Sequence, residues 1–296
     1  MERKIRVICP ANWSHHNTGW PCCVRELKNK LHTNTGVDFY SNSIISMLEK
    51  GWKAKRPWIS VVHATPEECK KTLSSENASM KKCLGLFALS EYACNFLRSI
   101  TEKKVSRLYL AIEKPICRFD PKAFLQGQPK IMTIGHWRRR FESIYELRAE
   151  GYRKVILKCS APEAPDYLKM SEEANRFGVK IEEELERTEY EKALRDNVVF
   201  LNLEDSSANN TIIECIMSKT PVLVNRLPAL EEHLGQDYPL FYDNIEEASK
   251  KIEDKNVVIL GHKYLCHIDT RPYEMENFAK TVSESEVYKC LPSIKL

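Results

Sequence analysis

The stretch from Val198 to Glu232 constrains the fold more than any other part of the chain. It begins with VVFLNL, a short apolar and β-branched run of the kind that forms a strand buried on both faces. A polar loop follows, and apolar residues at helical spacing return over Thr211–Met217. Pro221 then breaks the helix, and Val222–Val224 begins a second buried strand. The pattern predicts one βαβ unit of a parallel sheet.

The loop of this unit is a candidate anion-binding site. The first amides of a helix lack intrahelical partners and the helix dipole adds positive potential there, so a diphosphate over Asn209–Thr211 would satisfy both. The small side chains of Ser206 and Ser207 let an anion approach the backbone. Glu214, one turn into the helix, would accept hydrogen bonds from ribose hydroxyls. The alternative is a capping box, in which Glu214 bonds back to the Thr211 amide.

Composition limits the classes to which the chain can belong. A length of 296 residues suits one large or two medium domains, and 43% hydrophobic with 29% charged residues is typical of a globular protein. The net charge of +4 is too small to indicate a nucleic-acid partner. The sequence contains neither GxGxxG nor GxxxxGK[ST], which disfavours a dehydrogenase and a P-loop NTPase. It also lacks a DxD pair that would hold a metal–nucleotide complex.

The cysteines and the N-terminus bear on location. Eleven scattered cysteines without a CxxC motif argue against zinc and against a disulfide framework, and favour a reducing compartment. The first residues, MERKIRVICP, contain no signal-peptide h-region. No apolar run approaches the ~20 residues of a membrane span. We therefore expect a cytoplasmic protein without a transmembrane segment.

Two further strand ends carry residues that suit a ligand. His63 follows the predicted strand Trp58–Val62, and ligands of open α/β sheets bind outside the carboxyl ends of strands. An imidazole there can hydrogen-bond a hydroxyl near neutral pH, although a lone histidine is more often structural. Gly19 lies in the turn between the first predicted strand, Arg3–Cys9, and a helix that starts near Cys22. A plain βα turn is the alternative for Gly19.

Three consecutive arginines follow the predicted strand Lys130–Ile134. Cations at a helix start oppose the helix dipole, so a phosphate between Arg138 and Arg139 would explain their placement. A solvated helix start is the alternative. Ser90 reads as the N-cap of the next helix of the first half, and the polar segment Gln126–Pro129 reads as a linker.

Together these motifs resemble the family 4 glycosyltransferases, which are retaining enzymes of the GT-B fold. The resemblance is most specific over Val198–Glu232, where Glu214 matches the second glutamate of the family's donor motif. The family's first glutamate falls on Ser206 and its glycine loop on Ser207-Ala208-Asn209, which is a departure from the pattern. The family also has counterparts of Gly19, of His63, of the Ser90-Glu91-Tyr92 triplet and of the arginine pair.

The resemblance implies an α/β protein with two Rossmann-like domains whose parallel sheets face each other across a cleft. Residues 1–127 would form the acceptor-side domain and residues 128–271 the donor domain. Residues 272–296 would form a helix that crosses back onto the first domain. The short chain resembles compact members encoded by chloroviruses, large DNA viruses of algae, which would place it in the cytoplasm of the host cell.

The implied function is metal-independent, retaining transfer of a hexose from a nucleotide-diphospho-sugar to a hydroxyl of a glycan or glycoprotein. GDP-mannose is the first expected donor and UDP-glucose the second. No other cofactor and no nucleic-acid partner are expected, and a homodimer is compatible with this interpretation. His63 and Ser206 are the catalytic candidates. The donor-binding candidates are Gly19, Arg138, Arg139, Asp205, Ser207, Asn209, Asn210, Thr211 and Glu214.

Two alternatives stay open. A UDP-sugar 2-epimerase shares the GT-B fold but needs paired acid and base carboxylates, for which the first domain offers no clear candidate. A catalytically inactive nucleotide-sugar-binding module is suggested by Ser206 in place of the family's first glutamate.

Overall fold

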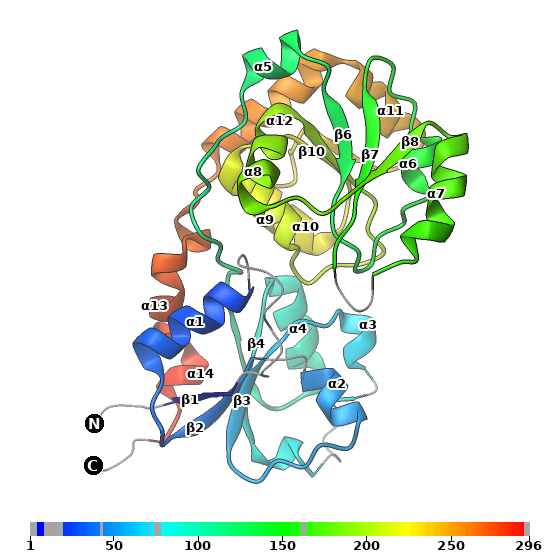
Figure 1. The fold of residues 1–296 in the computed structure, drawn as a ribbon. Coiled ribbons are helices and arrows are strands. Elements are labelled where there is room, and N and C mark those ends of the chain that lie inside the picture. Colours follow the sequence, from blue (N-terminus) through cyan, green and yellow to red (C-terminus); the bar gives the residue numbers. More distant parts are fainter. Residues whose placement is uncertain are drawn as a thin grey trace. The chain divides into compact units, whose positions relative to one another are not determined.

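The structure is a computed structural model that describes residues 5–8, 20–41, 44–70, 72–73, 78–160 and 164–292. The chain divides into two compact units (Figure 1). Unit 1 comprises Met1–Glu113 and Arg271–Leu296, and unit 2 comprises Lys114–Thr270. Each unit is built on one parallel sheet with helices packed against it, which confirms the predicted α/β class. The helices of the described ranges include none that is long and apolar enough to cross a membrane.

The sheet of unit 1 has five strands in sequential order, and every strand pair is parallel. The strands are β1 (Ile5–Ile8), β2 (Val37–Tyr40), β3 (Trp58–Val62), β4 (Cys83–Ala88) and β5 (Lys104–Arg107). The connecting helices are α1 (Trp20–Leu31), α2 (Ile44–Glu49), α3 (Pro66–Cys69), the 3-10 helix η1 (Met80–Lys82) and α4 (Glu91–Ile100). The strand β3 has the bounds predicted from the sequence, whereas β2 was not predicted. Ser90 caps α4 as predicted, since its hydroxyl accepts a hydrogen bond from the Ala93 amide at 3.2 Å.

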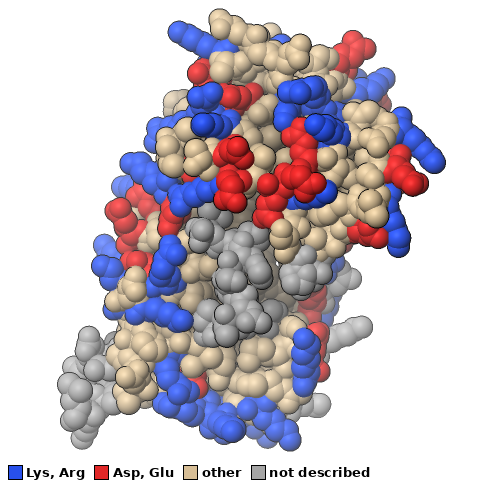
Figure 2. Space-filling view, in the orientation of Figure 1, with Lys and Arg blue, Asp and Glu red and all other residues tan. Residues whose placement is uncertain are grey.

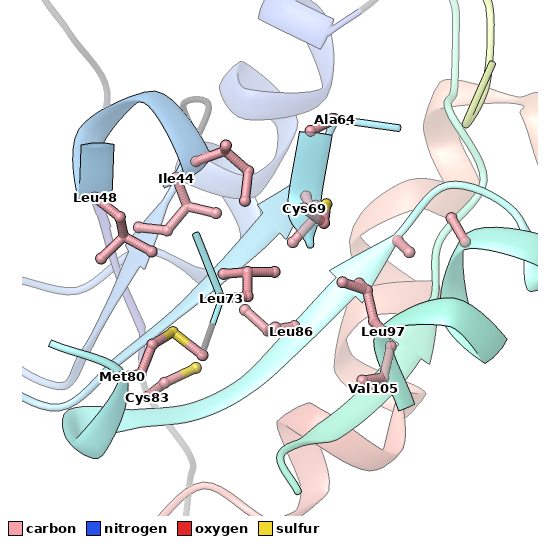
Figure 3. Close-up of a cluster of buried hydrophobic side chains, with 14 of the residues drawn as sticks. Ile44, Leu48, Ala64, Cys69, Leu73, Met80, Cys83, Leu86, Leu97 and Val105 are labelled. Carbon is pink, nitrogen blue, oxygen red and sulfur yellow. The ribbon is translucent and has the colours of Figure 1, made fainter. Parts of the chain in front are cut away.

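Buried aliphatic side chains from the sheet and its helices form the core of unit 1 (Figure 3). Helix α2 contributes Ile44 and Leu48, and the strand β4 contributes Leu86. The amphipathic α4 places Leu97 against β5, where Val105 is also buried. This layer of side chains fixes the carboxyl ends of the strands, where the candidate residue His63 lies.

The C-terminal residues belong to unit 1. They form η2 (Arg271–Tyr273), α13 (Met275–Glu284) and α14 (Glu286–Lys289). Phe278 of α13 is buried and meets the Trp20 ring edge-on, with 5.8 Å between the ring centroids. Val287 of α14 lies so close to Gly85 that a Cβ on that glycine would stand 2.8 Å from the Val287 Cγ1. Glycine is therefore required in β4 for α14 to approach the sheet.

The sheet of unit 2 has the strand order β11-β10-β9-β6-β7-β8. Its strands are β6 (Lys130–Thr133), β7 (Arg153–Leu157), β8 (Val179–Glu182), β9 (Val198–Leu201), β10 (Val222–Asn225) and β11 (Phe241–Tyr242). The chain builds outward from β6 to β8, returns to place β9 beside β6, and then builds outward on the other side. The strand order therefore reverses between β6 and β9.

The helices of unit 2 correct several sequence-based boundaries. They are α5 (Pro121–Gln126), α6 (Ser143–Glu146), α7 (Tyr167–Arg176), α8 (Arg187–Asp196), α9 (Asn210–Ser218), α10 (Pro228–Leu234), α11 (Ile245–Glu253) and α12 (Lys255–His267). The predicted linker at Gln126–Pro129 lies inside unit 2, because the division of the chain falls between Glu113 and Lys114. Asp120 caps α5, since its Oδ1 accepts hydrogen bonds from the amides of Lys122 and Ala123. Helix α8 begins at Arg187, and α12 was not predicted from the sequence.

Candidate functional site

The candidate site of unit 2 lies where the strand order reverses. The strands β6 and β9 are paired neighbours in the sheet, and sheets of this order bind ligands outside the carboxyl ends of the two strands at the reversal. The segments that follow the two strands are joined by backbone hydrogen bonds. The Arg140 amide donates to the Asn202 carbonyl at 2.9 Å, and the Glu204 amide donates to the Arg138 carbonyl at 3.1 Å. This pairing brings the arginine cluster to the loop that leads into α9.

Arg139 is fixed at the start of α9. Its Nε donates to the Ile134 carbonyl at 2.9 Å and its Nη1 to the Trp137 carbonyl at 2.8 Å. Its Nη2 reaches Asn209 Oδ1 at 3.3 Å and Thr211 Oγ1 at 3.4 Å. Burial lowers the pKa of Arg139 to about 10, so the side chain remains cationic at neutral pH. The site thus holds a positive charge in a defined position.

Gly135 leaves room for the Arg139 side chain in this position. Its φ of +79° lies in the left-handed region, which side chains disfavour. A Cβ on Gly135 would also stand 2.9 Å from Arg139 Nη2. The glycine therefore serves both the turn after β6 and the close approach of the guanidinium group.

Helix α9 starts one residue earlier than the sequence analysis predicted. Asn209 is its N-cap, and the Asn209 Oδ1 accepts a hydrogen bond from the Ile212 amide at 3.3 Å. Within the described ranges, the amides of Asn210 and Thr211 find no acceptor. These two amides and the Arg139 guanidinium form a cradle that suits an anion.

Glu214 is held from the neighbouring helix. The Tyr190 hydroxyl of α8 donates to Glu214 Oε2 at 2.5 Å. Burial raises the pKa of Glu214, while the bond from Tyr190 and the nearby Arg139 charge oppose that rise. Burial and the Glu214 charge raise the pKa of Tyr190 well above its ordinary value, so the phenol keeps the proton that it donates. The capping-box alternative is wrong, because Asn209 caps the helix and Glu214 bonds to Tyr190.

The loop before α9 buries its small residues. Ser206 and Ser207 are each 1% exposed. The Ser206 amide donates to Asp205 Oδ1 at 2.7 Å, which closes a tight turn. Among the described residues the Ser206 hydroxyl is buried without a hydrogen-bond partner. Ser206, which occupies the position of the family's first glutamate, therefore has a hydroxyl that can still hydrogen-bond a ligand.

Arg138 is oriented differently from Arg139. Its backbone is left-handed, with a φ of 55°. Its Nη1 lies 3.3 Å from Glu204 Oε2, and its guanidinium carbon stands 5.8 Å from the centroid of the Trp137 ring. The second predicted phosphate-binding arginine is therefore compensated by a carboxylate.

A cysteine in contact with a histidine and a tyrosine lies at the same edge of the sheet, and it was not predicted from the sequence. Cys159, which follows β7, places its Sγ 3.1 Å from His136 Nδ1 and 3.3 Å from the Tyr167 hydroxyl. Tyr190 was also missed, because it occurs in a charged helix, a pattern that is typical of a solvated face. A lone aromatic residue in such a helix was the available signal.

His63 belongs to unit 1 and follows β3 as predicted. Its ring meets the Trp20 ring edge-on, with 4.6 Å between the centroids, and Trp20 Nε1 donates to the Ser41 carbonyl at 2.6 Å. Burial lowers the pKa of His63 to about 4, so the imidazole is neutral at pH 7. Gly19 lies outside the residues that the structure describes. Among the described residues, no group of three His, Cys, Asp or Glu side chains is arranged to hold a metal ion.

Comparison by sequence finds no match, either to a protein-family model or to a curated protein. Comparison by structure finds proteins of similar fold, among them structures that contain UDP or UDP-glucose. Staphylococcus aureus TarM, in a complex that contains UDP, superposes with a TM-score of 0.65 at 13% identity, over 88% of this chain and 57% of TarM. Anabaena HepE in complex with UDP-glucose gives 0.67 at 9% identity, over 84% of this chain and 77% of HepE.

Sucrose-phosphate synthase from Thermosynechococcus elongatus gives a TM-score of 0.62 at 12% identity, over 88% of this chain and 74% of that enzyme. At sequence identities this low, the structural similarity is evidence for a shared fold. Two units with parallel sheets of five and six strands, superposing on these proteins over most of the chain, identify the fold as GT-B.

Proposed function

We propose that this protein is a retaining glycosyltransferase that moves a hexose from a nucleotide-diphospho-sugar to a hydroxyl of a glycan or glycoprotein, without a metal ion. The observation that carries the proposal is the position of Arg139. Its guanidinium is held within 3.4 Å of Thr211 Oγ1, at the start of a helix and at the reversal point of the unit 2 sheet. Sheet order, helix dipole and fixed cation all favour an anion at this place.

In this proposal the diphosphate of the donor binds over the start of α9. The amides of Asn210 and Thr211 donate to its oxygens, and Arg139 supplies positive charge that is already in position when the diphosphate leaves. Arg138 would exchange its contact with Glu204 for a phosphate oxygen, since a guanidinium group binds either anion. Charge stabilisation of this kind does what a metal ion does in other transferases.

Glu214 is proposed to bind the ribose. Tyr190 occupies Glu214 Oε2, and within the described ranges Oε1 is left to accept a ribose hydroxyl. Asp205 and Ser207 are proposed to contact the donor from the loop. The nearby Arg139 charge favours the ionised form of Glu214, which is the form that accepts hydrogen bonds.

His63 is proposed to contact a hydroxyl of the transferred sugar and to orient the attacking hydroxyl. Its pKa of about 4 keeps the ring neutral, so one nitrogen can accept a proton while the other donates. Ser206 offers a hydroxyl where a carboxylate nucleophile would otherwise stand. We therefore favour front-face substitution, assisted by the leaving phosphate, over a covalent intermediate.

The comparisons change the order of the proposed donors. HepE was solved with UDP-glucose and TarM with UDP, so UDP-glucose is now proposed first and GDP-mannose second. Membership of family 4, a relation to chloroviral enzymes, a cytoplasmic location and a homodimer stay predictions from the sequence.

The test is calorimetric titration with UDP, UDP-glucose, GDP and GDP-mannose in the presence of EDTA. We expect one nucleotide and its sugar donor to bind, and Arg139→Ala to weaken that binding by at least about tenfold, which is the loss of one charge-assisted hydrogen bond. Arg176→Ala, at an exposed arginine of α7, is the matched control and should bind like the wild type. Failure of all four compounds to bind would contradict the proposal.

The binding module is the second candidate, and the buried Ser206 hydroxyl favours it because a hydroxyl replaces a carboxylate there. Donor binding without donor hydrolysis or transfer to any acceptor would support this alternative. Turnover that His63→Ala abolishes while binding persists would support the enzyme.

A further inference from the structure

The two units of the chain differ in charge. Unit 1 contains 22 Lys and Arg against 14 Asp and Glu, a net charge of +8, whereas unit 2 contains 23 against 27, a net charge of −4. The overall charge of +4 conceals this difference. An asymmetry of this size indicates that the basic unit has an anionic partner of its own.

Part of the excess positive charge is concentrated at the amino ends of two neighbouring strands. The strands β3 and β4 are parallel and paired, so their amino ends share one edge of the sheet. The segment before β3 and the 3-10 helix before β4 place five exposed cations at this edge. We call them the amino-edge basic surface: Lys53, Lys55, Arg56, Lys81 and Lys82. Figure 2 shows Lys and Arg side chains gathered at the lower end of unit 1, where Figure 1 draws the amino ends of these strands.

Specific hydrogen bonds hold the two halves of this surface together. The Ser79 hydroxyl donates to the Trp52 carbonyl at 2.8 Å and accepts from the Ala54 amide at 3.0 Å. Lys82 Nζ reaches the Lys55 carbonyl at 3.1 Å. The fold thus brings like charges together at a defined place, although their mutual repulsion opposes it.

Among the described residues, few carboxylates compensate the cations of this surface. In the described part of the chain, none of its four lysines has a carboxylate within ion-pair distance. Arg56 lies 3.9 Å from Asp38, but that carboxylate is already held by Arg6 at 2.8 Å. Exposed lysines of unit 2 differ, since Lys169 and Lys250 each pair with a carboxylate on their own helix or its cap.

The chemistry of the surface favours lipid headgroups over nucleic acid. Lysine ammonium groups are strongly hydrated point charges that suit diffuse attraction to anionic headgroups, and four of the five cations are lysines. Sequence-tolerant binding of nucleic acid uses aromatic rings on which bases stack. Trp52, which precedes Lys53 in the chain, is instead packed edge-on against Tyr40 and Trp58, with 4.8 and 5.6 Å between the ring centroids.

We propose that the amino-edge basic surface docks unit 1 onto the surface of an anionic membrane. Such docking is peripheral and needs no spanning segment. It would leave the opposite edge of the sheet, where His63 follows β3, open to substrate. The inference rests on charge and geometry within unit 1 and does not depend on the proposed transferase activity.

The test is co-sedimentation of the full chain with phosphatidylcholine vesicles that contain about 30 mol% phosphatidylglycerol, in about 0.05 M salt. The wild type should bind these vesicles, should not bind pure phosphatidylcholine, and should be released by about 0.5 M salt. The combined variant Lys53→Gln, Lys55→Gln, Lys81→Gln and Lys82→Gln should bind at least ~100-fold more weakly, at about fivefold per charge.

A matched variant of unit 2 controls for net charge. It replaces four exposed lysines by Gln and should bind like the wild type: Lys122, Lys169, Lys192 and Lys263. Circular dichroism and thermal melting establish that both variants fold. Absence of wild-type binding to anionic vesicles, or equal losses in both variants, would overturn the proposal. Tighter binding to a nucleic-acid duplex than to vesicles, lost in the unit 1 variant, would overturn the membrane in favour of nucleic acid.

Discussion

The hydroxyl of Tyr190 donates a hydrogen bond of 2.5 Å to Glu214 Oε2 and thereby links α8 to α9 beneath the candidate site. Arg139 lies close enough to both groups to affect their pKa values. Glu191 of α8 and Cys215 of α9 are the other titratable neighbours of Glu214. Glu214 is therefore held in place by a donor from another helix, and its ionisation depends on that donor.

Removal of this donor should weaken nucleotide binding in a pH-dependent way. Burial raises the pKa of Glu214 and the Tyr190 bond lowers it, so Tyr190→Phe should raise that pKa further. The ionised Glu214 carboxylate is the form that accepts the hydrogen bond. When the pH is lowered, the variant should therefore lose nucleotide binding at a higher pH than the wild type does. We expect about tenfold weaker binding near pH 6 and a smaller loss at pH 8. Titration calorimetry between these pH values measures this.

Tyr264→Phe, on α12, is the control for the loss of a phenol. It should leave the pH profile of binding unchanged. A Tyr190→Phe profile that is parallel to the wild type would show that Tyr190 is only structural.

Gly135 and Gly151 form a matched pair for testing the Arg139 position. Both have a φ near +80°, but a Cβ on Gly135 would stand 2.9 Å from Arg139 Nη2, whereas a Cβ on Gly151 would meet nothing within 4 Å. Each change to alanine should lower the free energy of unfolding by about 1 kcal/mol through backbone strain. Only Gly135→Ala should also weaken nucleotide binding, because only there must the guanidinium move. Equal affinities of the two variants in calorimetry would contradict the role of Arg139.

The cap of α9 can be separated from ordinary helix capping in the same way. Asn209 and Asn244 both cap helices, since their Oδ1 atoms accept bonds from the Ile212 and Glu247 amides. Substitution of either by alanine should cost about 1 kcal/mol of stability in denaturant unfolding. Asn209 also lies 3.3 Å from Arg139 Nη2, so only Asn209→Ala should reduce the affinity for the nucleotide. A comparable loss in Asn244→Ala would trace the effect to global stability instead.

His63 should make unit 1 sensitive to acid. Burial lowers its pKa from 6.5 to about 4, so the unfolded chain binds the proton more tightly than the folded one. The stabilisation is fully present above pH 6.5 and is lost as the pH falls towards 4, with a size of about 3 kcal/mol. Denaturant unfolding at pH 7 and pH 4.5 measures the loss. His63→Gln should be less sensitive between these values, and an unchanged dependence in this variant would contradict the assignment.

Local sequence patterns predicted the elements whose signals are complete within a few residues. The β-branched run Val198–Leu203 contains the strand β9, and the residues with helical apolar spacing, Thr211–Met217, lie within α9. Ser90 caps α4, because its neighbours Glu91 to Ala93 already supply the first turn. The resemblance derived from these motifs predicted the GT-B fold.

Other elements were missed because their partners lie elsewhere in the chain. Helix α12 has an interrupted apolar pattern, and Gly261 is explained only by Leu240, whose Cδ1 would stand 2.5 Å from a Cβ at that position. Strand β2 has four residues and depends on β1 and β3 for its register. Such short segments carry too little periodicity to be assigned alone.

Local sequence patterns were sufficient to predict the βαβ unit, the polar loop before α9 and the types of residue near it. Which of these residues contact one another depends on the folded arrangement of the chain. Arg139 reaches Asn209 across 70 residues of sequence, and Tyr190 reaches Glu214 across 24. The lysines of the amino-edge basic surface come together because Ser79 joins two segments of the chain. Helical and strand periodicity depends on neighbours along the chain, whereas these contacts depend on the order in which distant strands pair.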